Sequence, residues 1–479
     1  MDFKKQFPFW IFTLGLAIFL LAPFYVQDGM FTDGIIYALV SRNLAQGIGE
    51  YWQPIFSDFP TNIFYEQPPF ALWLQSFFFK ILGNGFFTER VYCAFTYIIA
   101  CFSLFQGWKK INPTQQKFAW LPILLYTFTP LVFWSYRHNM LENTILIFDL
   151  WAIILFYEAA KSEVFFQKEN LINLILGTFF IFLSVLTKGL VGLFPLAFFG
   201  LYFIVFQRNF QKHFFQGVSI SILLVFCFAC LFFTFPKSLT FFTQYIDIQL
   251  LRSLRGEREA FDSGGRFLLL ERLLQELIPM FLTLLLLVIS FFLGKKKVFQ
   301  AQKKEAILFI LVGLSASLPM LISPKQHSYY LVPCFVYFAL AVSLLILPYF
   351  SMIEIYFSTQ KNSLIYKKIF TTISSILLIT SVLYVFKNKN TCSRDKAILH
   401  DVHILEKTFP AFTTFGIDAD YCSEYFIGAY LLRYGNLNTD CDNQNEALFL
   451  SQIDKNLSKH NYVKEENLGL TYFALWRKK

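Results

Sequence analysis

Eleven long apolar stretches dominate this sequence. A helix needs about 20 mostly apolar residues to cross a bilayer, and each stretch is close to that length. The stretches are continuously apolar and do not alternate with polar residues, so they predict helices and exclude a β-barrel. They are residues 8–26, 88–107, 118–135, 141–160, 170–187, 189–207, 214–235, 272–294, 305–323, 329–350 and 367–386. We therefore expect an all-α polytopic membrane protein with about eleven crossings.

Composition excludes the ordinary soluble classes. Hydrophobic residues make up 56% of the chain and charged residues 15%, whereas soluble domains have about 45–50% and about 25%. The net charge of +9 could suggest a nucleic-acid partner, but the basic residues gather in alternate connections between the apolar stretches. They are Lys4, Lys5, Lys109, Lys110, Lys117, Lys161, Lys168, Arg208, Lys212, Lys295, Lys296, Lys297, Lys303, Lys304, Lys361, Lys367 and Lys368.

The positive-inside rule places these connections in the cytoplasm. Because the number of crossings is odd, the N-terminus is expected in the cytoplasm and the C-terminal tail on the periplasmic, exterior side. We expect a multi-pass protein of a bacterial cytoplasmic (inner) membrane, with membrane lipids but no nucleic acid as partners.

Three exterior segments are long. They are residues 27–87, 236–271 and 387–479. In the first, residues 34–46 and 70–82 read as helices, and the second of these is too short to span and suits the membrane interface. Counting it as a crossing would reverse every later loop and move the lysine-rich connections outside.

The tail differs in kind from the rest of the chain. Residues 411–417 and 468–476 read as strands, and residues 420–434 read as a helix. The sequence therefore predicts a transmembrane catalytic domain over 1–386 and a small α/β exterior domain over 387–479. The tail either recognises the acceptor or serves as a stabilising cap, and the sequence does not choose between these two roles.

Cysteine usage leaves one question open. Cys392, Cys422 and Cys441 lie in the exterior tail, where a disulfide is permitted. One of the three would be left over, and spacing does not select the pair.

Acids and bases collect at the exterior ends of the apolar stretches. Ionisable residues at such positions are expensive to place and mark functional sites. By the parity of the crossings, all of them face one membrane surface. They are Asp33, Glu66, Arg137, His138, Glu142, Lys188 and Lys325.

Each of these residues also has a purely structural interpretation. Asp33 could cap the helix that follows it. Glu142 could cap its own helix or pair with Arg137, and Lys188 could be a lysine that reaches from a helix end toward the headgroups. His138 fits a solvated polar residue better than a metal ligand.

Four blocks of sequence carry a resemblance to a known family. They are Phe31-Thr32-Asp33-Gly34 with Ser41-Arg42-Asn43; Glu66-Gln67-Pro68-Pro69 with Arg90; Arg137 through Glu142; and Leu186-Thr187-Lys188-Gly189 together with Pro324-Lys325 and Tyr329-Tyr330. In order and spacing they resemble the GT-C glycosyltransferases of the protein O-mannosyltransferase and aminoarabinose (ArnT-like) transferase superfamily. The likeness covers about residues 8–350.

The resemblance implies the GT-C fold and an inverting glycosyltransferase. Its donor would be a sugar on a polyprenyl phosphate, and its acceptor a hydroxyl or phosphate of a lipid, glycan or protein, as in lipid A or protein glycosylation. No cofactor is certain, and a divalent metal ion is the one candidate. The implied roles are catalysis by Asp33 and Glu142; donor-phosphate binding by Lys188, Lys325, Arg42, Arg90 and Tyr330; and orientation of the acceptor or a metal by Glu66, Gln67, Arg137 and His138.

The residue types suit that reaction. A phosphate leaves as an anion and needs no general acid, whereas an acceptor hydroxyl benefits from a general base, for which Asp33 is the candidate. Cations in a low-dielectric site stabilise the leaving phosphate. The alternative is a transporter or flippase of a lipid-linked saccharide, but inverted repeats and midplane broken helices, which mark transporters, are not evident in the sequence.

Overall fold

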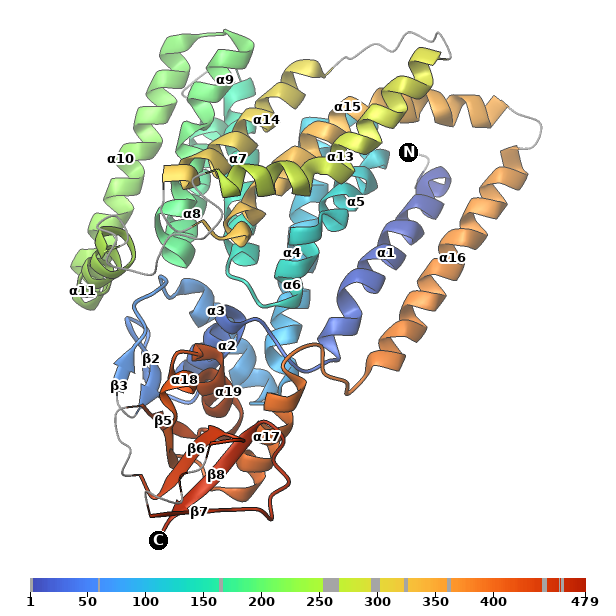
Figure 1. The fold of residues 1–479 in the computed structure, drawn as a ribbon. Helices are drawn as coiled ribbons and strands as arrows, with labels where there is room; N and C mark the ends of the chain where they lie inside the picture. The colour runs from blue at the N-terminus through green and yellow to red at the C-terminus, as the bar shows by residue number, and fades with distance from the viewer. Residues whose placement is uncertain are drawn as a thin grey trace.

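The computed structural model shows a bundle of long helices with a smaller mixed unit at one end (Figure 1). It describes residues 3–58, 61–162, 167–252, 267–293, 302–322, 326–359, 363–441, 446–455, 457 and 461–479. Within them, nine helices are long and apolar enough to cross a membrane. The chain is therefore a multi-pass membrane protein, as the apolar stretches predict.

The helices of the bundle follow the apolar stretches closely. They are α1 (Phe3–Tyr25), α4 (Phe87–Ile111), α5 (Trp120–Phe128), α6 (Pro130–Arg137), α7 (Glu142–Lys161), α8 (Lys168–Lys188), α9 (Phe198–Phe206), α10 (Phe210–Thr234), α13 (Leu268–Leu293), α14 (Lys303–Ser317), α15 (Val332–Thr359) and α16 (Ser363–Asn388). Helices α15 and α7 are buried along most of their length, whereas α10 and α16 are largely exposed. The bundle thus has α7 and α15 at its centre and presents α10 and α16 to lipid.

The sequence predicts eleven crossings, whereas the described residues contain nine helices that are long and apolar enough to span a membrane. Two local breaks in the helices explain this difference. The stretch 118–135 divides into α5 and α6 because Thr129 is extended before Pro130, and proline disfavours a helical residue before it. The segment Lys168–Phe206 forms one apolar run. It doubles back after Gly189, so that Gly192 packs against Ser184.

Short elements fill the connections at both ends of the bundle. They are α2 (Thr32–Ala45), α3 (Phe70–Leu82), α11 (Pro236–Tyr245), the tight helical turns η1 (Pro113–Phe118), η2 (Gly189–Ala197), η4 (Leu318–Ile322) and η5 (Ser328–Leu331), the π-helical turn η3 (Ile246–Leu251), and an antiparallel sheet of β1 (Gly49–Glu50), β2 (Gln53–Asp58) and β3 (Thr61–Ile63). Helix α3 occupies the range expected for an interfacial helix. The segments 253–266 and 323–325, with the predicted site residue Lys325, lie outside the described residues.

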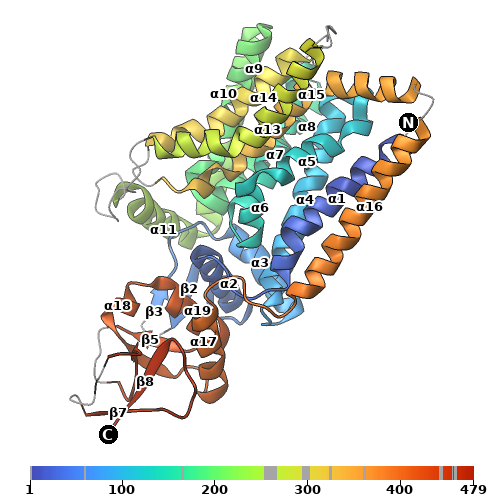
Figure 2. The same ribbon diagram turned by 45° about the vertical axis from the view of Figure 1, so that its right-hand side comes forward.

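The C-terminal unit is a mixed sheet with helices on it. Its elements are α17 (Lys396–Thr408), α18 (Ala419–Cys422), α19 (Tyr425–Gly435), β4 (Thr414–Ile417), β5 (Asn438–Asp440), β6 (Leu448–Gln452), β7 (Tyr462–Lys464) and β8 (Phe473–Lys478). The strand order is β5-β4-β6-β8-β7, parallel on the β5 side and antiparallel on the β7 side. In both views the unit sits beyond α2 and α3, at the end of the bundle far from α9 (Figures 1 and 2).

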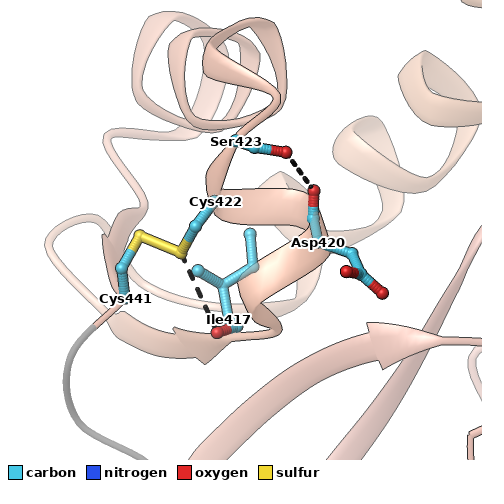
Figure 3. Close-up of a disulfide and its surroundings, with 5 residues drawn as sticks. All are labelled: Ile417, Asp420, Cys422, Ser423 and Cys441. Atoms are coloured by element: carbon cyan, nitrogen blue, oxygen red, sulfur yellow. Dashed lines mark hydrogen bonds between the residues drawn. A yellow bond between two sulfur atoms is a disulfide. The ribbon is translucent and has the colours of Figure 1, made fainter.

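Two details of this unit differ from expectation. The helix expected over 420–434 is divided into α18 and α19, and the second expected strand, 468–476, begins later, at Phe473. A disulfide joins Cys422 to Cys441, while Cys392 is a free thiol (Figure 3). The bond ties the end of α18 to the residue after β5.

Small residues set the helix spacing in the bundle, which generates a first prediction. An added Cβ at Gly177 of α8 would lie 2.4 Å from the Phe156 ring of α7, whereas one at Gly217 of α10 meets nothing within 4 Å. We expect Gly177→Leu to lower stability by about 1–3 kcal/mol through overpacking. Gly217→Leu, the matched control, should not. Thermal unfolding in detergent measures both, and equal losses would contradict the packing of α7 on α8.

Candidate active site

A buried ion pair lies where α7 begins and α8 ends. These two helices are joined by a short connection and run antiparallel, so the first residue of α7, Glu142, meets the last residue of α8, Lys188. The Lys188 ammonium donates a hydrogen bond to Oε1 of Glu142, and both side chains are buried. Oε2 of Glu142 finds no hydrogen-bond partner among the described residues. A buried charge pair with a spare acceptor is expensive to maintain, which marks it as a functional candidate.

Two tyrosines flank the ammonium. The Nζ of Lys188 lies 5.6 Å from the ring centroid of Tyr329 and 5.5 Å from that of Tyr330. The two rings meet edge to face at 5.0 Å, and both come from η5, just before α15. Aromatic faces attract a cation, so the two tyrosines add to the attraction that Glu142 exerts on the ammonium.

Asp33 completes the group from a third part of the chain. It is the second residue of α2 and is partly exposed. Its carboxylate lies within electrostatic range of the Tyr329 hydroxyl and of Glu142. The structure thus brings together Asp33, Glu142, Lys188 and Tyr330, which the sequence placed in one site.

Asp33 does not cap α2. The cap residue is Phe31, which offers no side-chain hydrogen bond, and Asp33 lies inside the first helical turn. The partial positive charge of a helix N-terminus favours a carboxylate there. The structural interpretation of Asp33 as a cap is therefore wrong, and its carboxylate is directed to Tyr329 instead.

A tight turn after α6 positions the start of α2. A Cβ at Gly34 would lie 2.0 Å from the carbonyl oxygen of His138, so only glycine permits this approach. Asn139, in the left-handed region with φ 54°, donates from its side chain to the Gly34 carbonyl at 3.0 Å. The Phe31 N–H donates to Nδ1 of His138 at 3.2 Å.

His138 can accept that hydrogen bond because it is neutral. Burial, together with the nearby guanidinium groups of Arg394 and Arg137, lowers the pKa of His138 to about 3. The sequence assigned His138 to orientation of an acceptor or metal. The structure gives it a different task, which is to fix the backbone two residues before Asp33.

Gly189 provides a second close approach beside Lys188. Its φ is 67°, and a Cβ there would lie 2.1 Å from the hydroxyl oxygen of Tyr245 at the end of α11. The glycine of the Thr-Lys-Gly block therefore allows α11 to pack against the end of α8. Tyr245 in turn lies within electrostatic range of Tyr330.

Arg42 does not fit its predicted role in donor binding. Its guanidinium is buried and donates to the carbonyl oxygens of Leu432 at 2.8 Å and Arg433 at 2.9 Å, at the end of α19. The side chain therefore joins α2 to the C-terminal unit. A basic residue near the exterior surface carries the same sequence signal for either task.

Arg90 needs the same correction. It is buried, donates to the carbonyl oxygen of Gln27 at 2.9 Å, and forms ion pairs with Glu89 at 3.0 Å and Asp28 at 3.5 Å. Its donors are spent on the segment that connects α1 to α2 and on Phe86 and Glu89 at the start of its own helix. Phosphate binding by Arg90 would require these contacts to break.

Arg137 is also placed elsewhere. Its Nε donates to the carbonyl oxygen of Leu20 at 2.7 Å, and its guanidinium lies over the rings of Phe24 and Phe133 at 3.8 and 4.6 Å. It therefore links α6 to α1 and does not form the alternative pair with Glu142.

The second exterior block lies at the margin of the group. Glu66 is exposed and within electrostatic range of the buried Tyr37, which faces Asp33 and Glu142 as well. Gln67 is partly buried. The roles expected for these two residues remain predictions.

Several residues of the site escaped the sequence argument. Tyr245 and Asn139 carry no pattern that separates them from ordinary packing residues. Asp149 did carry a signal, since it is an acid inside an apolar stretch. It is fully buried in α7 and accepts a hydrogen bond from Ser184 at 2.6 Å.

The expected divalent metal ion finds little support in the side chains present. Across the part of the chain that the structure describes, no three His, Cys, Asp or Glu side chains form a group that could hold a metal ion. In the candidate site the cation beside Glu142 is the Lys188 ammonium. A metal ion stays a prediction, and no step below depends on one.

Comparison with known proteins agrees with this geometry. Residues 66–232 match the family described as dolichyl-phosphate-mannose-protein mannosyltransferase. That segment contains Glu142 and Lys188 but begins after Asp33. No protein of curated function matches the sequence of the chain.

Solved structures match over nearly the whole chain. The apo structure of ArnT from Cupriavidus metallidurans has a TM-score of 0.62 at 13% identity and covers 96% of this chain and 95% of that one. The same protein bound to undecaprenyl phosphate has a TM-score of 0.61 at 12% identity and covers 97% of each. The apo oligosaccharyltransferase of Archaeoglobus fulgidus has a TM-score of 0.52 at 11% identity and covers 91% of this chain and 65% of that one.

The fold agrees with ArnT over 96% of the chain, and the family match overlaps three of the four sequence blocks, the fourth block only in its Leu186–Gly189 part. The resemblance inferred from the sequence is thereby confirmed: residues 66–232 match the dolichyl-phosphate-mannose-protein mannosyltransferase family, and nearly the whole chain has the fold of ArnT.

Proposed function

We propose that this protein is an inverting glycosyltransferase that moves a sugar from a polyprenyl phosphate to an acceptor at the membrane surface on the side of the C-terminal unit. The observation that carries the proposal is the meeting of Asp33, Glu142 and Lys188 in one site. They come from three separate segments of the chain, and Tyr329 contacts both Asp33 and Lys188. Such a site holds a carboxylate that can take the proton of the acceptor next to a cation that can bind the phosphate.

Asp33 is the proposed general base. It is partly exposed, so an acceptor hydroxyl can reach it, and its carboxylate lies within electrostatic range of the Tyr329 hydroxyl. As the sugar moves, the acceptor oxygen forms the new glycosidic bond, its proton passes to Asp33, and the bond from the anomeric carbon to the phosphate oxygen breaks. A single base suffices for this displacement, and the anomeric centre is inverted.

Lys188 is the proposed phosphate ligand. An ammonium has three N–H donors, and Glu142 receives one of them. The other two can bind the phosphate oxygens, where charge develops as the bond to the sugar breaks. Burial strengthens this interaction, because a charge in a low-dielectric site acts more strongly than one in water. The Tyr330 hydroxyl is a further candidate donor to the phosphate.

Glu142 has two proposed tasks. It holds the ammonium through Oε1, and it keeps Oε2 as an acceptor for a substrate hydroxyl. Lys325, which precedes the tyrosine pair in the sequence, is proposed as a second phosphate ligand.

A structural neighbour supports the proposed donor. ArnT from Cupriavidus metallidurans binds undecaprenyl phosphate, so a polyprenyl phosphate of this kind is the proposed lipid carrier. The acceptor is a hydroxyl or phosphate of a lipid, glycan or protein. We place the protein in a bacterial cytoplasmic membrane, with the N-terminus in the cytoplasm and the C-terminal unit outside.

Position along the helices favours a transferase over a transporter of the lipid-linked saccharide. The site residues sit at the ends of α7 and α8 and the start of α2, whereas transporters usually bind substrate near the bilayer midplane. Radiolabelled polyprenyl-phosphate sugar given to the protein in vesicles separates the two. Label transferred to a new molecule indicates a transferase, and donor moved unchanged to the other leaflet indicates a transporter.

The role of Asp33 generates a direct prediction. We expect Asp33→Asn to fold normally and to lose about 10²–10⁴-fold in the rate of sugar transfer, the usual contribution of a general base. Transfer of labelled sugar from a polyprenyl phosphate by purified protein is the measurement. Glu50→Gln is the matched control, because Glu50 is an exposed acid that pairs with Lys237 near the same surface. Full activity of Asp33→Asn would remove the base assignment.

The role of Lys188 needs a variant that folds. Removing Lys188 alone leaves Glu142 buried without its partner, which costs about 3–5 kcal/mol, so Lys188 and Glu142 are best replaced together by Met and Gln. We expect the double variant to keep near-normal stability and to bind polyprenyl phosphate at least about 10-fold more weakly, the loss of one charged contact.

Lys212→Met is the matched control for this experiment. Lys212 is also a buried lysine, but its ammonium donates to the carbonyl oxygens of Ala159 and Ala160 at the other end of α7. It should lose stability and keep lipid affinity. Wild-type affinity in the double variant would contradict phosphate binding by Lys188.

A further inference from the structure

We infer that the C-terminal unit is part of the catalytic machinery, because it fixes the position of Asp33 by holding the segment that leads into α2. Tyr430 and Tyr434 of α19 and His403 of α17 are the positioning residues. The inference rests on the proposed role of Asp33. It assigns the unit a mechanical role in catalysis, beyond recognition of an acceptor.

The segment concerned is short and leads directly to the proposed base. Helix α1 ends at Tyr25 and α2 begins at Thr32, so residues 26–31 set where Asp33 lies. This segment is not part of the helix bundle. Its position depends on what binds its backbone and its one carboxylate, Asp28.

Asp28 is held by side chains from three elements. Its carboxylate accepts from the Tyr434 hydroxyl at 2.6 Å and lies 2.9 Å from Nε2 of His403, both in the C-terminal unit. Arg90 of α4 approaches to 3.5 Å, and the Gly29 N–H donates at 2.7 Å. Burial alone would raise the pKa of Asp28. The hydrogen bonds from His403 and Tyr434 and the charge of Arg90 have the opposite and larger effect, and they lower this pKa to about 2. The carboxylate is therefore ionised and firmly bound at neutral pH.

Tyr430 binds the backbone two residues further on. Its hydroxyl accepts from the Met30 N–H at 3.0 Å, lies 2.8 Å from the Met30 carbonyl oxygen, and lies 3.0 Å from the carboxylate of Asp395. The two peptide units on either side of the Met30 Cα thus both contact one hydroxyl, which restricts rotation about that Cα. Asp33 follows only three residues later.

The apolar side chains on both sides of Asp33 belong to the core of the C-terminal unit. Met30 and Ile35 are fully buried and cluster with Leu399, Tyr430 and Leu475 of that unit. The hydrophobic core of the unit is thus completed by the residues that flank the proposed base. Displacing the unit would expose them to water.

Backbone hydrogen bonds add a second attachment. The chain between α16 and α17 pairs with the segment through Asp28 N–H to Thr391 at 2.9 Å, Ser393 N–H to Asp28 at 2.8 Å, and Asn390 N–H to Val26 at 3.1 Å. The strand-like bridge joins residues more than 360 positions apart. It extends the attachment from side chains to the main chain.

The end of α19 is anchored to the bundle as well. Arg433 is buried and donates to Glu89 of α4 at 2.8 Å and to the side chain of Asn84 at 2.8 Å. Arg42 of α2 donates back to the carbonyl oxygens of Leu432 and Arg433. Helix α19 is therefore fixed to α2 and α4 together, so its tyrosines hold the segment from a rigid support.

Variants that remove one hydroxyl test the inference. We expect Tyr430→Phe and Tyr434→Phe each to lower kcat by about 10-fold or more, since a displacement of about 1 Å in a reacting group can cost up to about 10²-fold. KM for the donor should change less than about twofold, because the phosphate contacts are made by other elements. The matched control is Tyr421→Phe, which removes a hydroxyl bond to the Tyr472 carbonyl within the unit, away from the segment.

Amide hydrogen exchange supplies a readout that does not need activity. Tyr430→Phe and Tyr434→Phe should speed exchange at residues 30–35, and Tyr421→Phe should not. Variants with wild-type exchange and wild-type kcat per folded molecule would overturn the inference. Faster exchange in the two variants, combined with a wild-type protein that transfers no sugar from any polyprenyl phosphate, would instead reject the proposed function, because the attachment would exist without the reaction.

The pH profile gives an independent test through His403. The groups facing it are Asp28, Glu406 on its own helix, the Tyr434 ring at 5.0 Å, and Arg90 across the carboxylate of Asp28. Hydrogen bonds to Asp28 and Glu406 raise the pKa of His403 to about 9. A raised pKa means that the ion pair is complete below the ordinary value of 6.5 and is lost as pH rises through about 9.

We therefore expect kcat of the wild type to fall as pH rises through about 9. The part of this fall that comes from deprotonation of His403 should be absent in His403→Gln. His403→Gln should have a lower kcat at neutral pH and a smaller decline on the alkaline side. His400→Gln is the control, because His400 is exposed on the same helix and contacts Asp401 rather than Asp28. The same alkaline decline in His403→Gln and wild type would overturn the role of His403.

Discussion

The buried contact between Glu142 and Lys188 is the constraint on which the site depends. It exists because α7 and α8 pack antiparallel, which places the first residue of one beside the last residue of the other. Two charges taken out of water cost several kcal/mol each, and their attraction rarely returns more than that. A pair of aliphatic residues would pack there at lower cost. The pair is therefore better explained by what it can bind than by what it adds to stability.

Close backbone approach completes the arrangement around this pair. Gly34 lets α2 contact the His138 carbonyl, and Gly189 lets the Tyr245 hydroxyl reach the end of α8. Each glycine immediately follows an ionisable residue of the site, Asp33 in one case and Lys188 in the other. The Asp33-Gly34 and Lys188-Gly189 pairs therefore have the same physical cause. The functional side chain sits where two elements come closer than any Cβ would permit.

The sequence predicted the class of fold and the centre of the site, and the reasons for its errors are physical. Continuous apolar runs predict membrane helices because a bilayer tolerates few other structures. Lys188 and Arg90 carry the same signal, a basic residue at a helix end. Only tertiary contacts separate the ammonium beside an aromatic pair from the guanidinium engaged by Gln27 and Asp28. Sequence patterns report which residues are costly to place and do not report which partners they meet.

The attachment of the C-terminal unit also has a general physical basis. Helices inside a membrane are held by their neighbours and by lipid, but a six-residue connection outside the helix bundle has neither and must be ordered by other contacts. Here those contacts come from residues at the far end of the chain, which bury Met30 and Ile35 and bind the carboxylate of Asp28. The buried arginines Arg42, Arg90 and Arg433 belong to the same attachment. The sequence assigned Arg42 and Arg90 to the phosphate, whereas in the structure these two arginines and Arg433 hold the frame in which Asp33 meets Lys188.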